Sequence, residues 1–101
     1  MKIKMTRSSG NVFKDLGFSP EEAEHLKIRS LMMAHLRELI TSRGLTQAGA
    51  AALFGVTQPR VSDLVRGKID LFSIDTLVDM LSHAGIKVKF TLSETSKSRA
   101  A

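Results

Sequence analysis

The sequence predicts a small, mainly α-helical domain of about five helices with one strand near its C-terminal end, and three observations carry this prediction. Apolar residues recur at helical spacing over residues 20–43. The pattern of residues 45–68 predicts two short helices separated by Gly55, a residue that tolerates the positive φ of a tight turn. Residues 86–92 (IKVKFTL) alternate apolar and polar side chains, which indicates a strand.

Length and composition favour one domain and a polyanionic partner. A chain of 101 residues fits a single domain, and its net charge of +5 has the sign expected of a nucleic-acid binder, although many basic proteins bind none. The absence of cysteine excludes disulfides and thiolate metal sites. No apolar run approaches the roughly 20 residues of a membrane span, and the N-terminus has no hydrophobic signal core. We therefore expect a cytoplasmic protein without a membrane partner.

The two ends of the chain differ from its middle. Residues 1–10 are basic without an acid, which predicts a flexible N-terminus that is either solvated or a basic arm for a partner. Residues 93–101 are small and charged and are expected to form a flexible tail. Between them, residues 11–92 form the expected domain. Its first part, residues 11–18, is too apolar for a free tail and is expected to form a helical turn that docks on the domain or on a partner.

The first long helix has clear signals at both ends. Ser19 is an N-cap, Pro20 takes the first helical position and Glu22 completes a capping box, whereas Gly44 ends the helix. Two apolar stripes along it are offset, so a bend or break around residues 28–31 stays open. The later stripe has i, i+4, i+7, i+8 spacing and consists of Met32, Leu36, Leu39 and Ile40.

Residues 45–68 (LTQAGAAALFGVTQPRVSDLVRGK) predict a helix-turn-helix, the unit whose second helix enters the major groove of DNA. Thr57 is placed to cap the second helix, and Pro59 lies in its first turn, where a missing N–H costs little. Small or apolar residues stand where two crossed helices must touch: Ala50, Ala51, Phe54, Val56, Val61 and Leu64.

This segment resembles the helix-turn-helix of the Xre/Cro-type repressor family in the residues LTQ, GVTQPRVSDL and GK. Over residues 11–92, NVFKDLGF, EEAEHLKIRS and SIDTLVDMLSHAGIKVKF resemble small Xre proteins that are encoded beside RelE/HigB-like toxins as HigA-type antitoxins. The resemblance implies a lambda-repressor-like bundle. The sequence departs from the family's pattern at Gly49, where many relatives carry a glutamate that closes a capping box with Thr46. Glycine at this position weakens the helix by roughly 0.5–1 kcal/mol relative to alanine.

The predicted base-reading residues lie at the start of the second helix, since polar side chains there reach base edges first. The resemblance puts Gln58, Pro59 and Asp63 on the DNA side, and Arg60 is close enough to join them. Gln58 can read adenine and Arg60 guanine, each through two hydrogen bonds. Asp63 can accept from cytosine or orient Arg60. The competing interpretation is that these are ordinary solvated helix residues.

Phosphate contacts would fix the register of the protein on DNA without reading sequence. Gln47 resembles the glutamine that the family uses in this way. Arg66 and Lys68 equally suit a helix C-terminus, where cations favour the macrodipole. The expected phosphate-contacting residues are Gln47, Thr57, Arg43, Ser62, Arg66 and Lys68.

The predicted strand needs a partner, because a lone strand cannot satisfy its backbone groups. Residues 1–5 (MKIKM) could serve, but the same strand of a second chain is the more economical partner and would give a two-fold dimer. The expected dimerisation residues are the apolar ones of the strand: Ile86, Val88, Phe90 and Leu92.

Enzymatic chemistry is not expected. The three histidines lack metal-ligand spacing, and the chain has neither a glycine-rich phosphate loop nor a nucleophile elbow, so no cofactor or metal is predicted. The leading prediction is a dimeric repressor of a palindromic operator, located at the nucleoid when bound. The resemblance extends it to an antitoxin that represses its own operon and neutralises a RelE/HigB-like toxin. The alternatives are a stand-alone or phage-derived Xre repressor, or a protein-interaction module with vestigial DNA binding.

Overall fold

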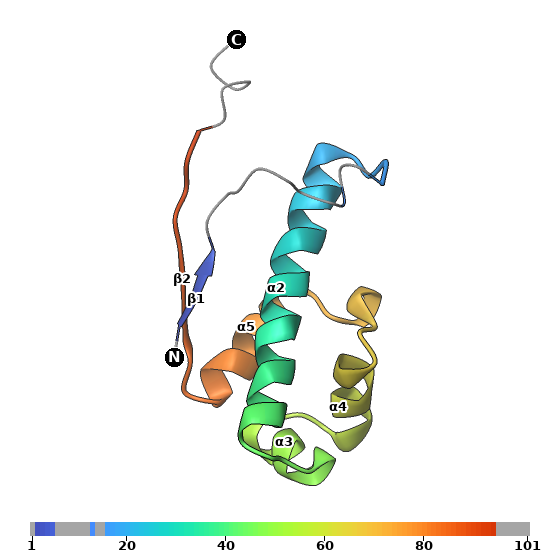
Figure 1. Ribbon diagram of the computed structural model, residues 1–101, viewed down its shortest axis with the longest axis vertical. Coiled ribbons are helices and arrows are strands. Elements are labelled where there is room, and N and C mark those ends of the chain that lie inside the picture. The colour runs from blue at the N-terminus through green and yellow to red at the C-terminus, as the bar shows by residue number, and fades with distance from the viewer. Residues whose placement is uncertain (1, 6–12, 14–15, 95–101) are drawn as a thin grey trace.

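A computed structural model describes residues 2–5, 13 and 16–94 of the chain, and it is mainly α-helical, as predicted. One long helix runs through the middle of the molecule, with the shorter helices and a two-stranded ribbon arranged around it (Figure 1). In chain order the elements are β1 (Lys2–Met5), α2 (Pro20–Ser42), α3 (Gln47–Phe54), α4 (Gln58–Val65), the 3-10 turn η1 (Ile69–Leu71), α5 (Ile74–His83) and β2 (Lys87–Phe90). Within the described residues, no helix is long and apolar enough to cross a bilayer.

Helix α2 begins as the sequence predicted. The Ser19 hydroxyl accepts from the Glu22 backbone N–H at 3.2 Å, and the Glu22 carboxylate accepts from the Ser19 N–H at 3.4 Å, which completes the capping box. The helix is unbroken through residues 28–31, so the break considered there does not occur. Before it, Phe18 donates from its backbone N–H to the Phe13 carbonyl across a turn that contains Gly17.

The core lies between α2 and the three shorter helices. Both apolar stripes of α2 are used: Ala23 and Leu26 are buried near its start, and Met32, Met33, Leu36 and Leu39 further along. The other helices and the segments that follow α4 and α5 complete the core with Ala50, Ala51, Phe54, Val61, Leu64, Phe72, Leu77, Met80, Leu81 and Ile86. No polar or charged residue of the described part is fully buried, so apolar packing fixes how α4 sits on the domain.

Strand β2 pairs with β1 of the same chain, the partner judged less economical from the sequence, whereas pairing of β2 with a second chain stays a prediction. The two strands are parallel, and Ile3 lies opposite Val88. Residues 2–5, which composition placed in a flexible terminus, are therefore part of a sheet. Apolar and polar residues alternate in MKIKM, which is the pattern expected of a paired strand. Of the predicted flexible ends, residues 1, 6–10 and 95–101 lie outside the described residues, as do residues 11, 12, 14 and 15 of the segment expected to form a docked helical turn.

The four predicted dimerisation residues divide into two groups. Ile86 is 4% exposed and belongs to the domain core, and Val88 is half-buried against it, so Ile86 is not available to a second chain. Phe90 and Leu92 are 67% and 91% exposed. The sequence pattern placed these residues on one apolar face. In the structure, Ile86 and Val88 pack on the core, whereas Phe90 and Leu92 are exposed, and β2 runs beside β1 at the side of the molecule (Figure 1).

Candidate nucleic-acid interface

The turn between α3 and α4 is built as the sequence predicted. Gly55 ends α3 in the left-handed conformation, with φ of +68°, and the Val56 backbone N–H donates to the Ala51 carbonyl at 3.0 Å. The His83 ring of α5 lies against this turn, since a Cβ placed on Gly55 would come within 2.8 Å of it. The turn is thus restrained by the His83 ring as well as by its own backbone conformation.

Thr57 occupies the N-cap position of α4, as predicted, but its side chain makes no capping hydrogen bond. Pro59, the second residue of the helix, has no N–H, which removes one of the two donors that an N-cap side chain can use. Thr57 is exposed. Its hydroxyl is therefore available to an external group such as a phosphate.

Helix α4 is amphipathic in the way that a DNA-reading helix requires. Val61 and Leu64 are fully buried and hold one side on the core, while Gln58 and Pro59 are exposed at its N-terminal end. These two predicted base contacts lie where a groove of DNA could receive them. Ser62, a predicted phosphate contact, is only half-exposed.

Arg60 does not extend with Gln58 and Pro59. Its Nη1 donates to the Leu71 carbonyl of η1 at 2.9 Å, and its guanidinium carbon lies 5.2 Å from the centre of the Phe72 ring. Asp63 forms an ion pair with Lys68 at 4.0 Å, so in this structure Asp63 does not serve to orient Arg60. The four predicted base contacts are thus two exposed side chains and two that are engaged within the protein.

The predicted phosphate contacts lie mostly at helix ends. Gln47 opens α3 and is exposed, directly after Thr46, whose hydroxyl accepts from the Gly49 N–H at 3.0 Å. Arg43 is the C-cap of α2, Arg66 that of α4, and both are exposed. Since a Cβ on Gly49 would lie 3.3 Å from the Thr46 hydroxyl oxygen, glycine at this position leaves room for the cap itself.

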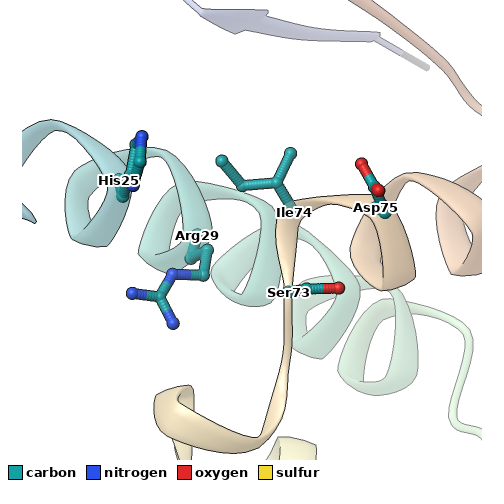
Figure 2. A pocket seen from close by; sticks show the side chains of 5 residues that line it. All are labelled: His25, Arg29, Ser73, Ile74 and Asp75. Atoms are coloured by element: carbon teal, nitrogen blue, oxygen red, sulfur yellow. The ribbon is translucent and has the colours of Figure 1, made fainter.

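Sequence reasoning missed Arg29 of α2. Its Nη1 lies 3.3 Å from the Ile69 carbonyl and 3.5 Å from the Phe72 carbonyl, so a second arginine holds the η1 turn. No local pattern could have shown this, because the arginine and its acceptors are about forty positions apart. Beside Arg29 is an open cavity of about 300 Å³, also lined by His25, Ser73, Ile74 and Asp75. Figure 2 shows Arg29 extending away from His25 and Asp75, so the charged groups do not converge on a ligand.

The other titratable groups give no second site. The described residues contain no group of three or more His, Cys, Asp or Glu side chains that could hold a metal ion. His35 on α2 has a buried Nε2 without a hydrogen-bond partner, and burial lowers the pKa of this imidazole, against the opposing effect of Glu38. The neutral imidazole is therefore the form that the fold favours.

Comparisons with known proteins agree with this geometry. Residues 12–93, which include α2 to α5, match the model of a family described as a helix-turn-helix domain. An uncharacterized HTH-type transcriptional regulator of Haemophilus influenzae is 32% identical over 87 residues, which cover 83% of this chain and 85% of that protein. A solved structure assigned to the XRE family of transcriptional regulators superposes with a TM-score of 0.68 at 32% identity, covering 79% of this chain and 90% of that one.

Proposed function

The chain belongs to the XRE-type helix-turn-helix family of DNA-binding transcriptional regulators, and we propose that it is a repressor that binds a palindromic operator as a two-fold dimer. The observation that supports this most is the placement of α4. Val61 and Leu64 fix the helix on the core, and Gln58 and Pro59 stand exposed at its N-terminal end. In a dimer on B-DNA, the two α4 helices would lie about 34 Å apart, one turn of the duplex.

Gln58 is the residue to which we assign direct reading of a base. Its amide can make two hydrogen bonds to adenine, and the neighbouring Pro59 offers an apolar surface of the kind that contacts a thymine methyl group. Gln47 and Thr57, at the starts of α3 and α4, would bind phosphates on either side and set the register. The proposed half-site therefore contains an A·T pair opposite the N-terminal end of α4.

The test is binding of the purified protein to its own upstream DNA and to a scrambled duplex, measured by fluorescence anisotropy at 50 and 200 mM salt. Gln58→Ala is expected to lose about 1–3 kcal/mol on the upstream duplex and almost nothing on the scrambled one. Gln47→Ala is the matched control, since losing a phosphate contact weakens both duplexes alike. Wild-type binding that is equal on both duplexes and disappears at the higher salt would overturn the proposal.

We further propose that β2 forms the dimer interface through its second edge. β1 occupies one edge, and the side chains of Phe90 and Leu92 are exposed. Antiparallel pairing of two β2 strands about a two-fold axis would cover them and leave both β1 strands in place. Analytical ultracentrifugation should find a dimer that the double variant Phe90→Asp, Leu92→Asp converts to a monomer. The control is Leu16→Asp, at an exposed apolar residue before α2; an unchanged dimer in the double variant would contradict this interface.

We also propose a more specific role as an antitoxin, which is supported by the resemblance of residues 11–92 to HigA-type proteins. The chain would then bind a RelE/HigB-like toxin encoded beside it and repress the shared operon. Expression of the neighbouring gene alone should arrest growth, and co-expression of wild-type or Gln58→Ala protein should restore it. A neighbouring product that is neither toxic nor bound would indicate a stand-alone repressor. Rescue by a wild-type protein that binds no DNA would indicate a protein-interaction module.

A further inference from the structure

The segment that connects α4 to α5 is held by two arginines from different helices. It consists of the short turn η1 and Phe72, and three of its backbone carbonyls accept hydrogen bonds from side chains. Leu71 accepts from Arg60 of α4, while Ile69 and Phe72 are within reach of Arg29 of α2. No residue of η1 itself is buried, so side-chain packing alone does not fix the turn. The two guanidinium groups therefore add polar ties to both helices, beside the packing of Ile69 and Phe72 on the core.

Arg60 is held more firmly than a single surface hydrogen bond would hold it. The 2.9 Å bond to the Leu71 carbonyl involves an ionised donor, which makes it stronger than a neutral one. The same guanidinium lies over the ring of Phe72, which is 1% exposed and so does not move freely. To extend along α4 and read a base, Arg60 would have to give up both contacts. The Arg60 side chain is thus directed to the η1 side of α4, whereas Gln58 remains exposed at the N-terminal end of the helix, where we propose that DNA binds.

We propose that Arg60 is a positioning residue that fixes α4 relative to η1 and does not read a guanine. This inference rests on the proposed function, because it assigns the role of one residue within the DNA interface. It also changes the base sequence expected in the operator. Gln58 alone would specify a base pair at the N-terminal end of α4, and Arg60 would specify none. Arg29 holds the other side of the same turn, so α2, α4 and the start of α5 form one rigid frame.

The first arm of the test uses DNA. A panel of upstream duplexes, each with one base pair of the half-site changed, is titrated with wild-type protein, Arg60→Ala, Arg60→Lys and Gln58→Ala. A positioning role predicts that Arg60→Ala weakens binding to every duplex by a similar factor, about tenfold, and keeps their order of affinity. Arg60→Lys keeps the charge but loses the flat surface that stacks on Phe72. On the scale of log Kd, it should therefore recover less than half of the affinity that Arg60→Ala loses. Gln58→Ala, the matched control, should abolish preference at one base pair only.

The second arm needs no DNA. Hydrogen exchange is measured at the amides of Leu71 and Phe72, which bond to the carbonyls of Lys68 and Ile69. Arg60→Ala and Arg60→Lys should exchange faster than wild type at these two amides, whereas Gln58→Ala should not. If Arg60→Ala removes discrimination at a single base pair, or if both Arg60 variants leave exchange unchanged, the proposal is wrong. If wild-type protein shows no preference among duplexes, the proposed function fails, and the exchange measurement still decides whether Arg60 holds η1.

Discussion

Replacing Phe72 by alanine is expected to lower the free energy of unfolding by about 3–5 kcal/mol, the largest effect of any single change considered for this chain. Phe72 is 1% exposed and is one of only two phenylalanines in the core that the described residues form. Its removal would leave a cavity beside α4 and would also take away the ring under the Arg60 guanidinium. Domains of this size have a total stability of about 5–15 kcal/mol, so the variant should be marginal.

Urea denaturation followed by circular dichroism would measure this loss at a fixed protein concentration. The neighbouring Leu71→Ala is the matched control, because Leu71 is 48% exposed and Arg60 bonds to its backbone carbonyl, which the substitution keeps. The control should stay within about 0.5 kcal/mol of wild type. If the two variants were equally stable, Phe72 would not have the packing role that its burial indicates.

Replacing Gly55 by alanine should destabilise the protein by at least 1–2 kcal/mol, on the order of the cost of placing an L-residue in the left-handed region. The φ of +68° at Gly55 imposes that cost whatever the surroundings. The new Cβ would also lie 2.8 Å from the His83 ring, which must turn away and lose its contact with the turn. Because this turn sets the angle between α3 and α4, operator affinity should fall as well.

Two comparisons separate the backbone cost of this change from its steric cost. Gly44→Ala has a similar φ of +60° and nothing within 4 Å of the new Cβ, so it should show the backbone cost alone. In a His83→Ala background, the additional loss caused by Gly55→Ala should shrink to the Gly44→Ala value. Thermal unfolding of the five proteins would measure both quantities. An equal loss for Gly44→Ala and Gly55→Ala in the wild-type background would show that His83 does not restrain the turn.

The sequence predicted the features of the fold that depend on neighbouring residues. Ser19 and Glu22 form the capping box, Gly55 takes the left-handed turn conformation, and the long helix spans Pro20–Ser42, within one residue of the predicted range of 20–43. The exposure of Gln58 and Pro59 was also predictable, since burial of Val61 and Leu64 determines which side of α4 faces outward. These features depend on spacing and on local hydrogen bonds.

The remaining features join residues that are distant in the chain. No local pattern could choose between β1 and a second chain as the partner of β2, because strand pairing depends on tertiary proximity. The contacts of Arg60 were missed for the same reason: polarity and position suit a base-reading arginine, but a carbonyl and a ring from the next connection compete for its guanidinium. Local pattern thus predicted which side of α4 is exposed, but it could not reveal the long-range partners of Arg60.

The parallel ribbon has a consequence for the order in which the chain folds. Lys2 pairs with Lys87, so β1 is made before all four α-helices of the described residues and pairs with a strand that is made after them. The helices between them have close contacts in sequence and can form first, whereas closing a loop of this length carries a large entropic cost. We therefore expect the helices to form before β1 and β2 pair.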